Sequence, residues 1–347
     1  MLVIGVFVVA AANVLWRLRL VVVPVALAVL VTTFLTPPTR WLKDRGFAEA
    51  PAALTVLLAA VVIVAGLGLL LVPPVVDQFE ELDIGINDGI DRVQKWLVES
   101  PLPLSHEEIA SAIDRLQSQL SDSLSVIADR IVSGAVVVLE VVVGLVLTAV
   151  VVFFLLKDGA RIWSWCADLA PPARRNDVRA AGDRVWQALG GYVRGQTLVA
   201  LFDAILIGLA LALIGVPLVL PLAVLTFFGA YVPVVGATVA GLLAVLVALV
   251  ANGTVAAVVV LASILVVQQV EGNVVQPIVV GRAVHVHPLA ILLGVTAGGV
   301  LAGILGALFA GPTVAVVAAI LTHVRERAEP DTAASSPERD PADGRPP

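Results

Sequence analysis

The sequence predicts an all-α polytopic membrane protein with about eight transmembrane helices, two Gly/Pro-broken segments among them, and a small extracytoplasmic helical insertion. Three observations predict this fold class. Of the 347 residues, 59% are hydrophobic and 14% are charged, with a mean hydropathy of +1.02, whereas soluble domains are about 25% charged. Apolar segments that approach or exceed the roughly 20 residues needed to cross a bilayer recur along the chain. Charged residues, proline or glycine separate them.

The apolar segments divide the chain into regions. Three N-terminal spans fall within 1–73, a fourth span within 134–156, and further spans with broken helices within 197–324. Most of the charged residues lie in the remaining regions, 74–133, 157–196 and 325–347. The individual segments lie at about 1–15, 20–36, 50–73, 134–156, 197–214, 217–250, 254–270 and 288–322.

The distribution of basic residues predicts the orientation, because Lys and Arg near span ends stay in the cytoplasm. Residues 37–50 carry three basic side chains, and residues 157–196 carry seven against four acidic ones. Residues 77–133 hold twelve acidic side chains against four basic ones. We therefore expect a multi-pass protein of the cell membrane with 74–133 outside and both termini in the cytoplasm.

The polar regions outside the spans are predicted to be helical or disordered. Region 74–133 shows a helical apolar period, and Ser105 with Glu108 forms a capping box. It serves either as a gate or oligomer contact, or as an amphipathic pair packed on its own protomer or on lipid headgroups. Residues 173–192 form an amphipathic helix that we expect along the inner membrane face. The Pro-rich tail, 325–347, is predicted to be disordered.

Two apolar segments, 217–250 and 288–322, are too long for one simple span and contain Gly and Pro midway. Backbone that leaves a helix at membrane depth must line protein or a water-filled cavity, so these segments are candidate pathway elements. "PLAVL" at 221–225 recurs as "PLAIL" at 288–292. A true repeat would place two half-helix hairpins face to face; close helix packing through small residues is the other interpretation.

Three acidic residues lie within or beside predicted spans, and each is a possible coupling acid: Glu140, Asp203 and Glu271. Glu271 stands out because Gln268, Gln269, Asn273 and Gln276 surround it in sequence, so one ligand could meet several polar groups. We interpret residues 268–288 as a non-helical connector between two spans that presents these groups to a translocation path; the competing interpretation is a solvated span end. His285 and His287 lack a third ligand, so no metal site is predicted.

Several motifs, taken together, resemble the autoinducer-2 exporter family of PerM-like permeases over roughly residues 20–325. They are "GGYVRGQ" (190–196), "GVPL" (215–218), "YVPVVGA" (231–237), "QQVEGNVVQPIVVGR" (268–282) and "HPLAILL" (287–293) followed by spaced glycines and a proline. The resemblance implies an inner-membrane transporter that forms a homo-oligomer, with a pentamer as the candidate state. Some members export the quorum-sensing signal autoinducer-2, and others are described as sodium or lithium/proton antiporters.

By motif position, the resemblance also implies pathway residues. They are Gly195, Gln196, Pro233, Gly236, Gln268, Glu271, Gly272, Asn273, Pro277, Gly281, His287 and Pro288. Asp203 and Glu140 fall outside the motifs. We therefore expect Glu271→Gln to abolish transport, and Asp203→Asn and Glu140→Gln to leave appreciable activity.

The sequence excludes other classes of function. The net charge of −6 disfavours nucleic acid as a partner. No phosphate-binding loop, hydrolase motif or multi-Cys cluster occurs, so neither an ATP-driven pump, an enzyme nor a bound cofactor is expected. Three hypotheses remain: gradient-driven export of a small polar solute such as autoinducer-2, cation/proton antiport, and a non-transporting scaffold. The first is preferred, because the one acid within a motif, Glu271, lies at a predicted span end.

Overall fold

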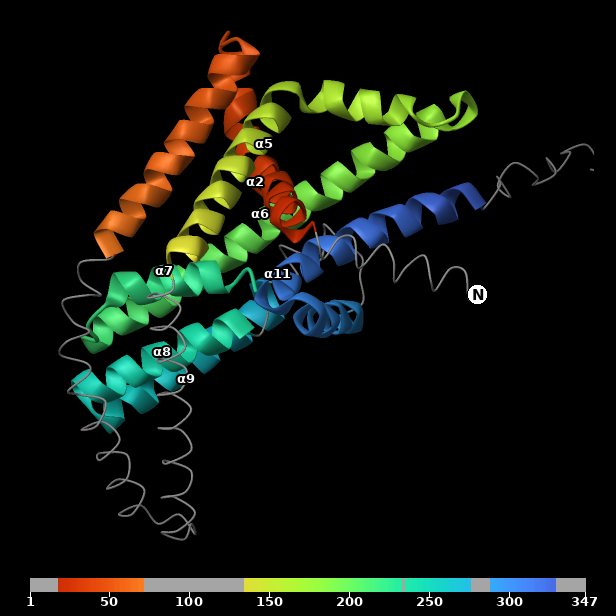
Figure 1. Ribbon diagram of the computed structural model, residues 1–347. Coiled ribbons are helices and arrows are strands. Elements are labelled where there is room, and N and C mark those ends of the chain that lie inside the picture. Colours follow the sequence, from red (N-terminus) through yellow and green to blue (C-terminus); the bar gives the residue numbers. More distant parts are fainter. Residues whose placement is uncertain (1–17, 72–133, 233–234, 276–287, 329–347) are drawn as a thin grey trace, which may run out of the picture.

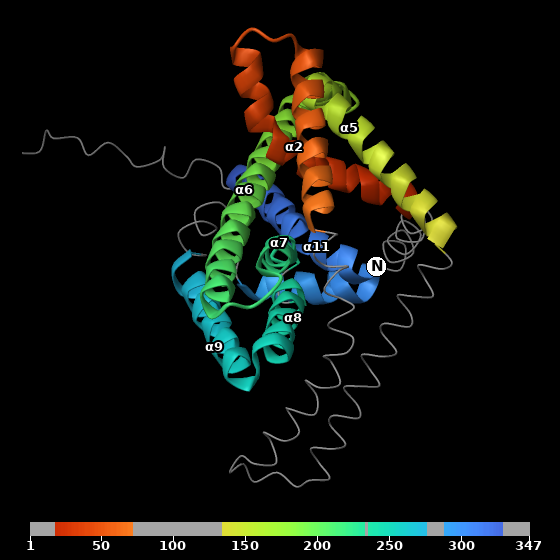
Figure 2. The same cartoon turned by 90° about the vertical axis from the view of Figure 1, so that its left-hand side faces the viewer.

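The described residues, 18–71, 134–232, 235–275 and 288–328 of a computed structural model, are built from helices, with no strand among them (Figures 1 and 2). Seven of these helices are long and apolar enough to cross a membrane. The predicted polytopic helical fold is therefore confirmed. The first predicted span, region 74–133 and residues 329–347 lie outside the described residues.

The N-terminal helices form one group, which we call the N-terminal unit: α2 (Arg19–Asp44), the helix Glu49–Leu71 and α5 (Gly134–Asp168). Its core is aliphatic, and its buried members are Ala28, Leu35, Ala53, Val56, Val152 and Leu156. Buried threonines of α2 bond within their own helix; Thr32 Oγ1 donates to the Ala28 carbonyl at 2.6 Å. Helix α2 continues through Pro37 and Pro38 to Asp44, eight residues past the predicted span end.

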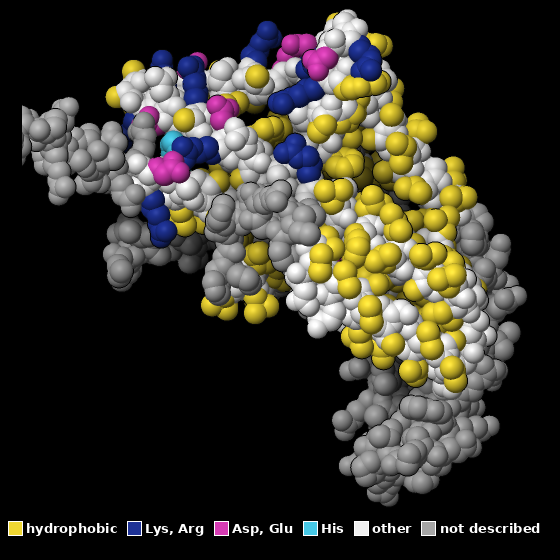
Figure 3. All heavy atoms as spheres, turned by 180° about the vertical axis from the view of Figure 1, so that it is seen from behind, with side chains coloured by type: hydrophobic (Ala, Val, Ile, Leu, Met, Phe, Trp, Pro, Cys, Tyr) yellow, Lys and Arg dark blue, Asp and Glu magenta, His cyan; other side chains and the backbone are white. Residues whose placement is uncertain are grey.

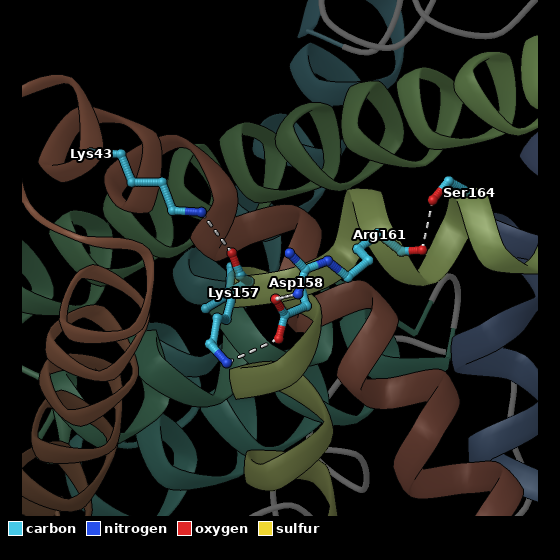
Figure 4. Close-up of polar contacts among 6 residues, drawn as sticks. Lys43, Lys157, Asp158, Arg161 and Ser164 are labelled. Atoms are coloured by element: carbon cyan, nitrogen blue, oxygen red, sulfur yellow. Dashed lines mark hydrogen bonds and ion pairs between the residues drawn. The ribbon is translucent and has the colours of Figure 1, made fainter.

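Charged side chains gather at one end of the molecule, while hydrophobic side chains cover most of the remaining face in Figure 3. One of the polar contacts in Figure 4 joins α2 to α5 at this charged end, and the others lie within α5. Lys43 Nζ donates to the Leu156 carbonyl at 3.1 Å, and Lys157 pairs with Asp158 at 3.1 Å. The separation of charged and apolar surface is that of a protein whose charged end lies at the membrane–water interface.

Helix α6 (Arg175–Ile214) follows a short 3₁₀ turn (Pro172–Arg174) and joins the charged end to the apolar body. The expected amphipathic helix 173–192 and the expected span 197–214 are parts of this one continuous helix, because no proline interrupts them. Gly215 ends α6 in the left-handed conformation (φ 79°), which glycine adopts without steric cost.

Segment 217–250 folds back as a hairpin of α7 (Val219–Gly229) and α8 (Val235–Asn252). At its tip, a methyl group on Gly236 would overlap the Gly229 carbonyl, so the two arms meet backbone to backbone. At its open end, Asn252 Nδ2 donates to the Gly215 carbonyl at 3.2 Å, which places the end of α8 beside the end of α6. The sequence break at Gly and Pro is therefore a reversal of direction.

Segment 288–322 folds back in a similar way within α11 (Pro288–Ala328). Ala302 and Gly303 leave the helical conformation, with φ of −139° and 61°, and the two arms meet where Gly298 faces the Gly306 backbone. Val232, just after α7, packs against Val295, Ala307 and Ala310 of α11. The two broken segments are thus two hairpins in mutual contact.

Helix α9 (Thr254–Val270) continues into a π-helical turn, η2 (Glu271–Val275). We call α6, α7, α8, α9, η2 and α11 together the C-terminal core. Glu271–Val275 was expected to begin a non-helical connector, and it is helical. The core between α6, α7, α8 and α9 is aliphatic; its buried members are Ile207, Leu211, Val216, Leu222, Ala244, Val247, Ala248, Val260, Ile264 and Val267.

Candidate functional site

Two acidic side chains meet in the interior of the C-terminal core. Asp203 of α6 is 3% exposed and Glu271 of η2 is 9% exposed, and the two carboxyl groups lie within hydrogen-bonding reach of each other. Among the described residues, these are the only buried charged groups. Acidic side chains are almost never fully buried unless they are paired, so their meeting identifies a site.

The local structure explains how each carboxyl group is placed. Asp203 lies on the buried face of α6, where Val199, Ala200 and Ile207 also face inward. Glu271 opens the π-helical turn at the end of α9, and a π-helical turn shifts the direction of the following side chains; such turns occur often at functional sites. The pair is therefore held by one continuous helix and one irregular turn.

The Asp203 carboxyl group is only partly satisfied. Its Oδ1 atom is buried and lacks a hydrogen-bond partner among the described residues. Most buried polar groups in folded proteins are hydrogen-bonded, and exceptions often mark functional positions or places where a small ligand binds. The pair can accept a further donor.

A second polar group lies nearer the charged end of α6, where the tip of the α7–α8 hairpin contacts this helix. Gln196 Nε2 donates to the Ala230 carbonyl at 2.6 Å, and the hydroxyls of Thr197 and Tyr231 lie 2.7 Å apart. Ala230 follows α7, where the backbone leaves the helix, and Gln196 supplies a donor to it. Backbone groups freed at membrane depth require such partners.

The α11 hairpin reaches the same part of α6 through Tyr192. A methyl group on Gly311 would overlap the Tyr192 hydroxyl, so this ring rests directly on the α11 backbone. Tyr192 also lies close enough to Tyr231 for the two hydroxyls to interact electrostatically. We call Tyr192, Gln196, Thr197 and Tyr231 the tyrosine junction; α6 meets both hairpins here.

The acid pair and the tyrosine junction lie along one side of α6. Positions 192, 196, 200 and 203 are separated by four, four and three residues, a spacing that aligns side chains on a helix. Between Gln196 and Asp203 this side contains Ala200, which is fully buried and small. The tyrosine junction and the acid pair therefore lie on the same side of α6, with the small side chain of Ala200 between them.

The structure brings together some of the residues predicted from sequence and separates others. Gln196, Asp203, Gly236 and Glu271 lie in the contacts just described. Gln268 is half-buried, whereas Gly272 and Asn273 are exposed and do not face the acid pair. Glu140 is exposed on α5, in the N-terminal unit. Pro288 begins α11, and Pro233, Pro277, Gly281, His285 and His287 lie outside the described residues.

Sequence reasoning missed the roles of Tyr192, Tyr231 and Gly311. A signal was present, because the chain contains two tyrosines and both occur in the quoted motifs. Among the described residues, no group of three His, Cys, Asp or Glu side chains could hold a metal ion. The site is thus one of carboxyl, hydroxyl and amide groups.

Comparisons with known proteins find transporters and permeases. A family model described as AI-2E family transporter matches residues 4–326. A protein of Mycobacterium tuberculosis, named as a candidate transport protein, is 41% identical over 307 residues, covering 88% of this chain and 84% of its own. YrrI of Bacillus subtilis, similarly named, is 28% identical over 90% of this chain and 89% of its own. The candidate permease PerM of Escherichia coli is 27% identical over 86% of each chain.

Proposed function

The chain belongs to the AI-2E transporter family, and from this premise we propose that it exports a small polar solute across the cell membrane without nucleotide hydrolysis. The observation that carries the proposal is the polar side of α6, which faces both hairpins through the tyrosine junction and ends at the acid pair. Autoinducer-2 is the first candidate solute, because members of the resembled family export it.

The chemistry of the junction suits a polar solute. Hydroxyl and amide side chains can both donate and accept hydrogen bonds, so they can exchange their partners for those of a solute rich in hydroxyl groups. Breaking the Gln196 and Thr197 contacts would release the tip of the α7–α8 hairpin from α6. Solute entry and hairpin movement would thus use the same hydrogen bonds.

The driving force is proposed to be a gradient. No phosphate-binding loop occurs in the sequence, so uphill transport must use an ion gradient or the membrane potential. A signal made inside the cell can also leave along its own gradient. The family is one of transporters, and no enzymatic role is proposed.

Cation/proton antiport is the second candidate, and the buried acid pair is the observation that favours it. A carboxyl group inside a membrane protein is costly and commonly marks an ion or proton path. In this case the transported species would be the ion itself, and the tyrosine junction would serve only to control access.

Transport in everted membrane vesicles separates these candidates. Uptake of labelled autoinducer-2 that depends on the protein supports solute export, and sodium-driven proton movement without solute supports antiport. Absence of both supports the scaffold hypothesis. Gln196→Leu should reduce solute uptake, whereas Gln187→Leu, on the exposed side of the same helix, is the matched control and should not.

The orientation is also a proposal: multi-pass insertion in the cytoplasmic membrane with the charged end inside and both termini inside. Asn176 lies near the charged start of α6, and Asn252 lies beside Gly215 at its other end. After replacement of Cys166 by serine, Asn252→Cys should react with an impermeant thiol reagent added outside. Asn176→Cys should react only after permeabilisation, and the reverse pattern would contradict this orientation.

Homo-oligomer formation, with a pentamer as the candidate state, is proposed on the family resemblance. The apolar helix Glu49–Leu71 agrees with it, because its surface is available to lipid or to another copy; Leu69 is 78% exposed and Val62 67%. Native mass spectrometry of protein extracted in mild detergent measures the number of copies. A monomer under those conditions would contradict the proposal.

A further inference from the structure

We propose that Asp203 and Glu271 together hold one exchangeable proton and form the proton-coupling site of this transporter. The inference rests on the proposed transport function and adds to it the identity of the coupling ion. It also assigns an essential role to Asp203, which was expected from sequence to tolerate replacement by asparagine.

A hydrogen bond between the two side chains requires a proton. An ionised carboxylate has acceptor oxygens and no donor, so two carboxylates cannot bond to each other directly. With one proton, the pair carries a single negative charge and one O–H donor. Asp203 and Glu271, both buried and within hydrogen-bonding reach, are therefore placed to share one proton.

The surroundings favour a proton over a metal ion. A hard cation takes a shell of several oxygen ligands, whereas the neighbouring core side chains, among them Ile207, Ile264 and Val267, are aliphatic. The helices α7, α8 and α9 contain no acidic, basic or histidine side chain. On α6 the nearest basic residue is Arg194, which is exposed and nine positions toward the charged end. Two carboxyl groups already joined to each other leave a cation too few ligands.

If the pair of Asp203 and Glu271 had only a structural role, we would expect all of its buried oxygen atoms to have hydrogen-bond partners. The buried Asp203 Oδ1 has no partner among the described residues, so the pair leaves a buried acceptor unused, which is unfavourable for a static contact. An amide at either position could supply the same hydrogen bond without an ionisable group. The combination of two ionisable groups and an unused acceptor favours exchange over static support.

Proton release couples the pair to conformation. When the proton passes to water, the pair changes from one negative charge to two, and the charges lie at hydrogen-bond distance in an apolar core. Their repulsion is large where the local dielectric constant is low. Loss of the proton therefore favours separation of α6 from η2 and entry of water or solute, and uptake of a proton from the other side favours closure.

Amide variants test the proposal without removing the hydrogen bond. In Asp203→Asn or Glu271→Gln, the amide N–H can donate to the remaining carboxylate, so folding should be retained while the exchangeable proton is lost. Solute-driven proton movement in liposomes, followed with an enclosed pH-sensitive dye and labelled autoinducer-2 as solute, should fall on the order of a hundredfold in each variant, by analogy with loss of a proton-transferring group. Glu140→Gln, an exposed acid in a membrane helix, is the matched control and should match the unmodified protein.

A second measurement does not depend on the solute. Infrared difference spectroscopy of the purified protein during a pH change should show the C=O stretch of a protonated carboxyl group, which both amide variants lose and Glu140→Gln keeps. The exchange variant Asp203→Glu with Glu271→Asp retains both carboxyl groups and should recover the band and part of the proton movement.

The outcomes separate this inference from the proposed function. Proton movement or an unchanged carboxyl band in either amide variant would overturn the inference, as would coupling that follows sodium and ignores pH. If labelled autoinducer-2 does not move through the unmodified protein, the proposed solute is wrong, while the infrared result still decides the proton site.

Discussion

The N-terminal unit and the C-terminal core are both apolar helical groups, but they treat polar atoms differently. In the N-terminal unit the buried polar side chains are threonines, which bond to carbonyls of their own helix, as Thr32 and Thr39 do. In the C-terminal core the buried Thr226 bonds in the same way within α7, whereas the buried Asp203 faces Glu271 of another element. Bonds within a helix survive when helices move, whereas bonds between helices must break.

The two regions also differ in how closely their glycines approach other backbone. Helix Glu49–Leu71 contains Gly66 and Gly68, and nothing lies within 4 Å of the Cβ position of either. Two glycine pairs of the C-terminal core, Gly229 with Gly236 and Gly298 with Gly306, face each other's backbone directly. We infer that the helix Glu49–Leu71 tolerates substitution at its glycines, whereas the C-terminal core depends on particular backbone contacts.

The largest expected contrast concerns glycine. Gly298→Ala places a methyl group against the Gly306 backbone, which cannot move aside as a side chain could, and should lower the free energy of unfolding by about 3 kcal/mol. Gly68→Ala should be neutral or should stabilise the helix by up to ~1 kcal/mol. Thermal unfolding in detergent measures both. Equal effects would remove the distinction between the two regions.

The second contrast concerns acidic residues. Asp203→Leu removes the partner of the Glu271 hydrogen bond inside the core and should destabilise the fold by about 2 kcal/mol. Glu140→Leu, on an exposed part of α5, should stay within ~0.5 kcal/mol of the original stability. Denaturant unfolding followed by tryptophan fluorescence tests this pair. A neutral Asp203→Leu would show that the hydrogen bond contributes little to the fold.

The third contrast tests the tyrosine junction. Gly311→Ala forces the Tyr192 ring away from α11 and should cost about 1 to 2 kcal/mol, less than at Gly298 because a side chain can yield. Combining it with Tyr192→Leu should recover part of that loss, and a double-mutant cycle on stability and solute uptake gives the interaction energy. Strict additivity would mean that the two residues do not interact.

The smallest contrast compares two hydrogen bonds. Gln196→Leu removes a donor to the Ala230 carbonyl and should cost about 1 kcal/mol while lowering solute uptake. Thr36→Val removes a bond to the Thr32 carbonyl within α2 and should change stability by no more than ~0.5 kcal/mol, with uptake unchanged. Loss of uptake in Thr36→Val would show that the N-terminal unit also takes part in transport.

The fold was largely predictable because long apolar segments have few possible structures in a bilayer. The ends of the helices were harder to predict. Helix α2 runs through Pro37 and Pro38 to Asp44, and α6 joins the predicted amphipathic segment 173–192 to the predicted span 197–214. The glycine and proline breaks gave the positions of the two hairpins. They could not give the reversal of direction, which depends on contacts such as Gly229 with Gly236.

The candidate site was predictable only in part. Glu271 was found from its polar neighbours in sequence, yet its contact is with Asp203, 68 positions earlier, and Asn273 lies exposed. Asp203 has no polar neighbours in sequence, so its role depends on how α6 packs. Local sequence patterns describe what surrounds a residue along the chain; they do not describe what faces it from another helix.

The length of α6 has a mechanical consequence. Its 40 residues extend about 60 Å at 1.5 Å per residue, roughly twice the apolar thickness of a bilayer. Such a rod acts as a lever: its charged start lies 28 residues before Asp203, about 42 Å away, so a tilt of about 10° about the acid pair would displace that end by about 7 Å. The charged end is tied to the end of α11 by the Arg184–Glu326 ion pair. A small tilt that starts at the carboxyl groups is therefore enlarged at the charged end, where a fluorophore could detect the movement.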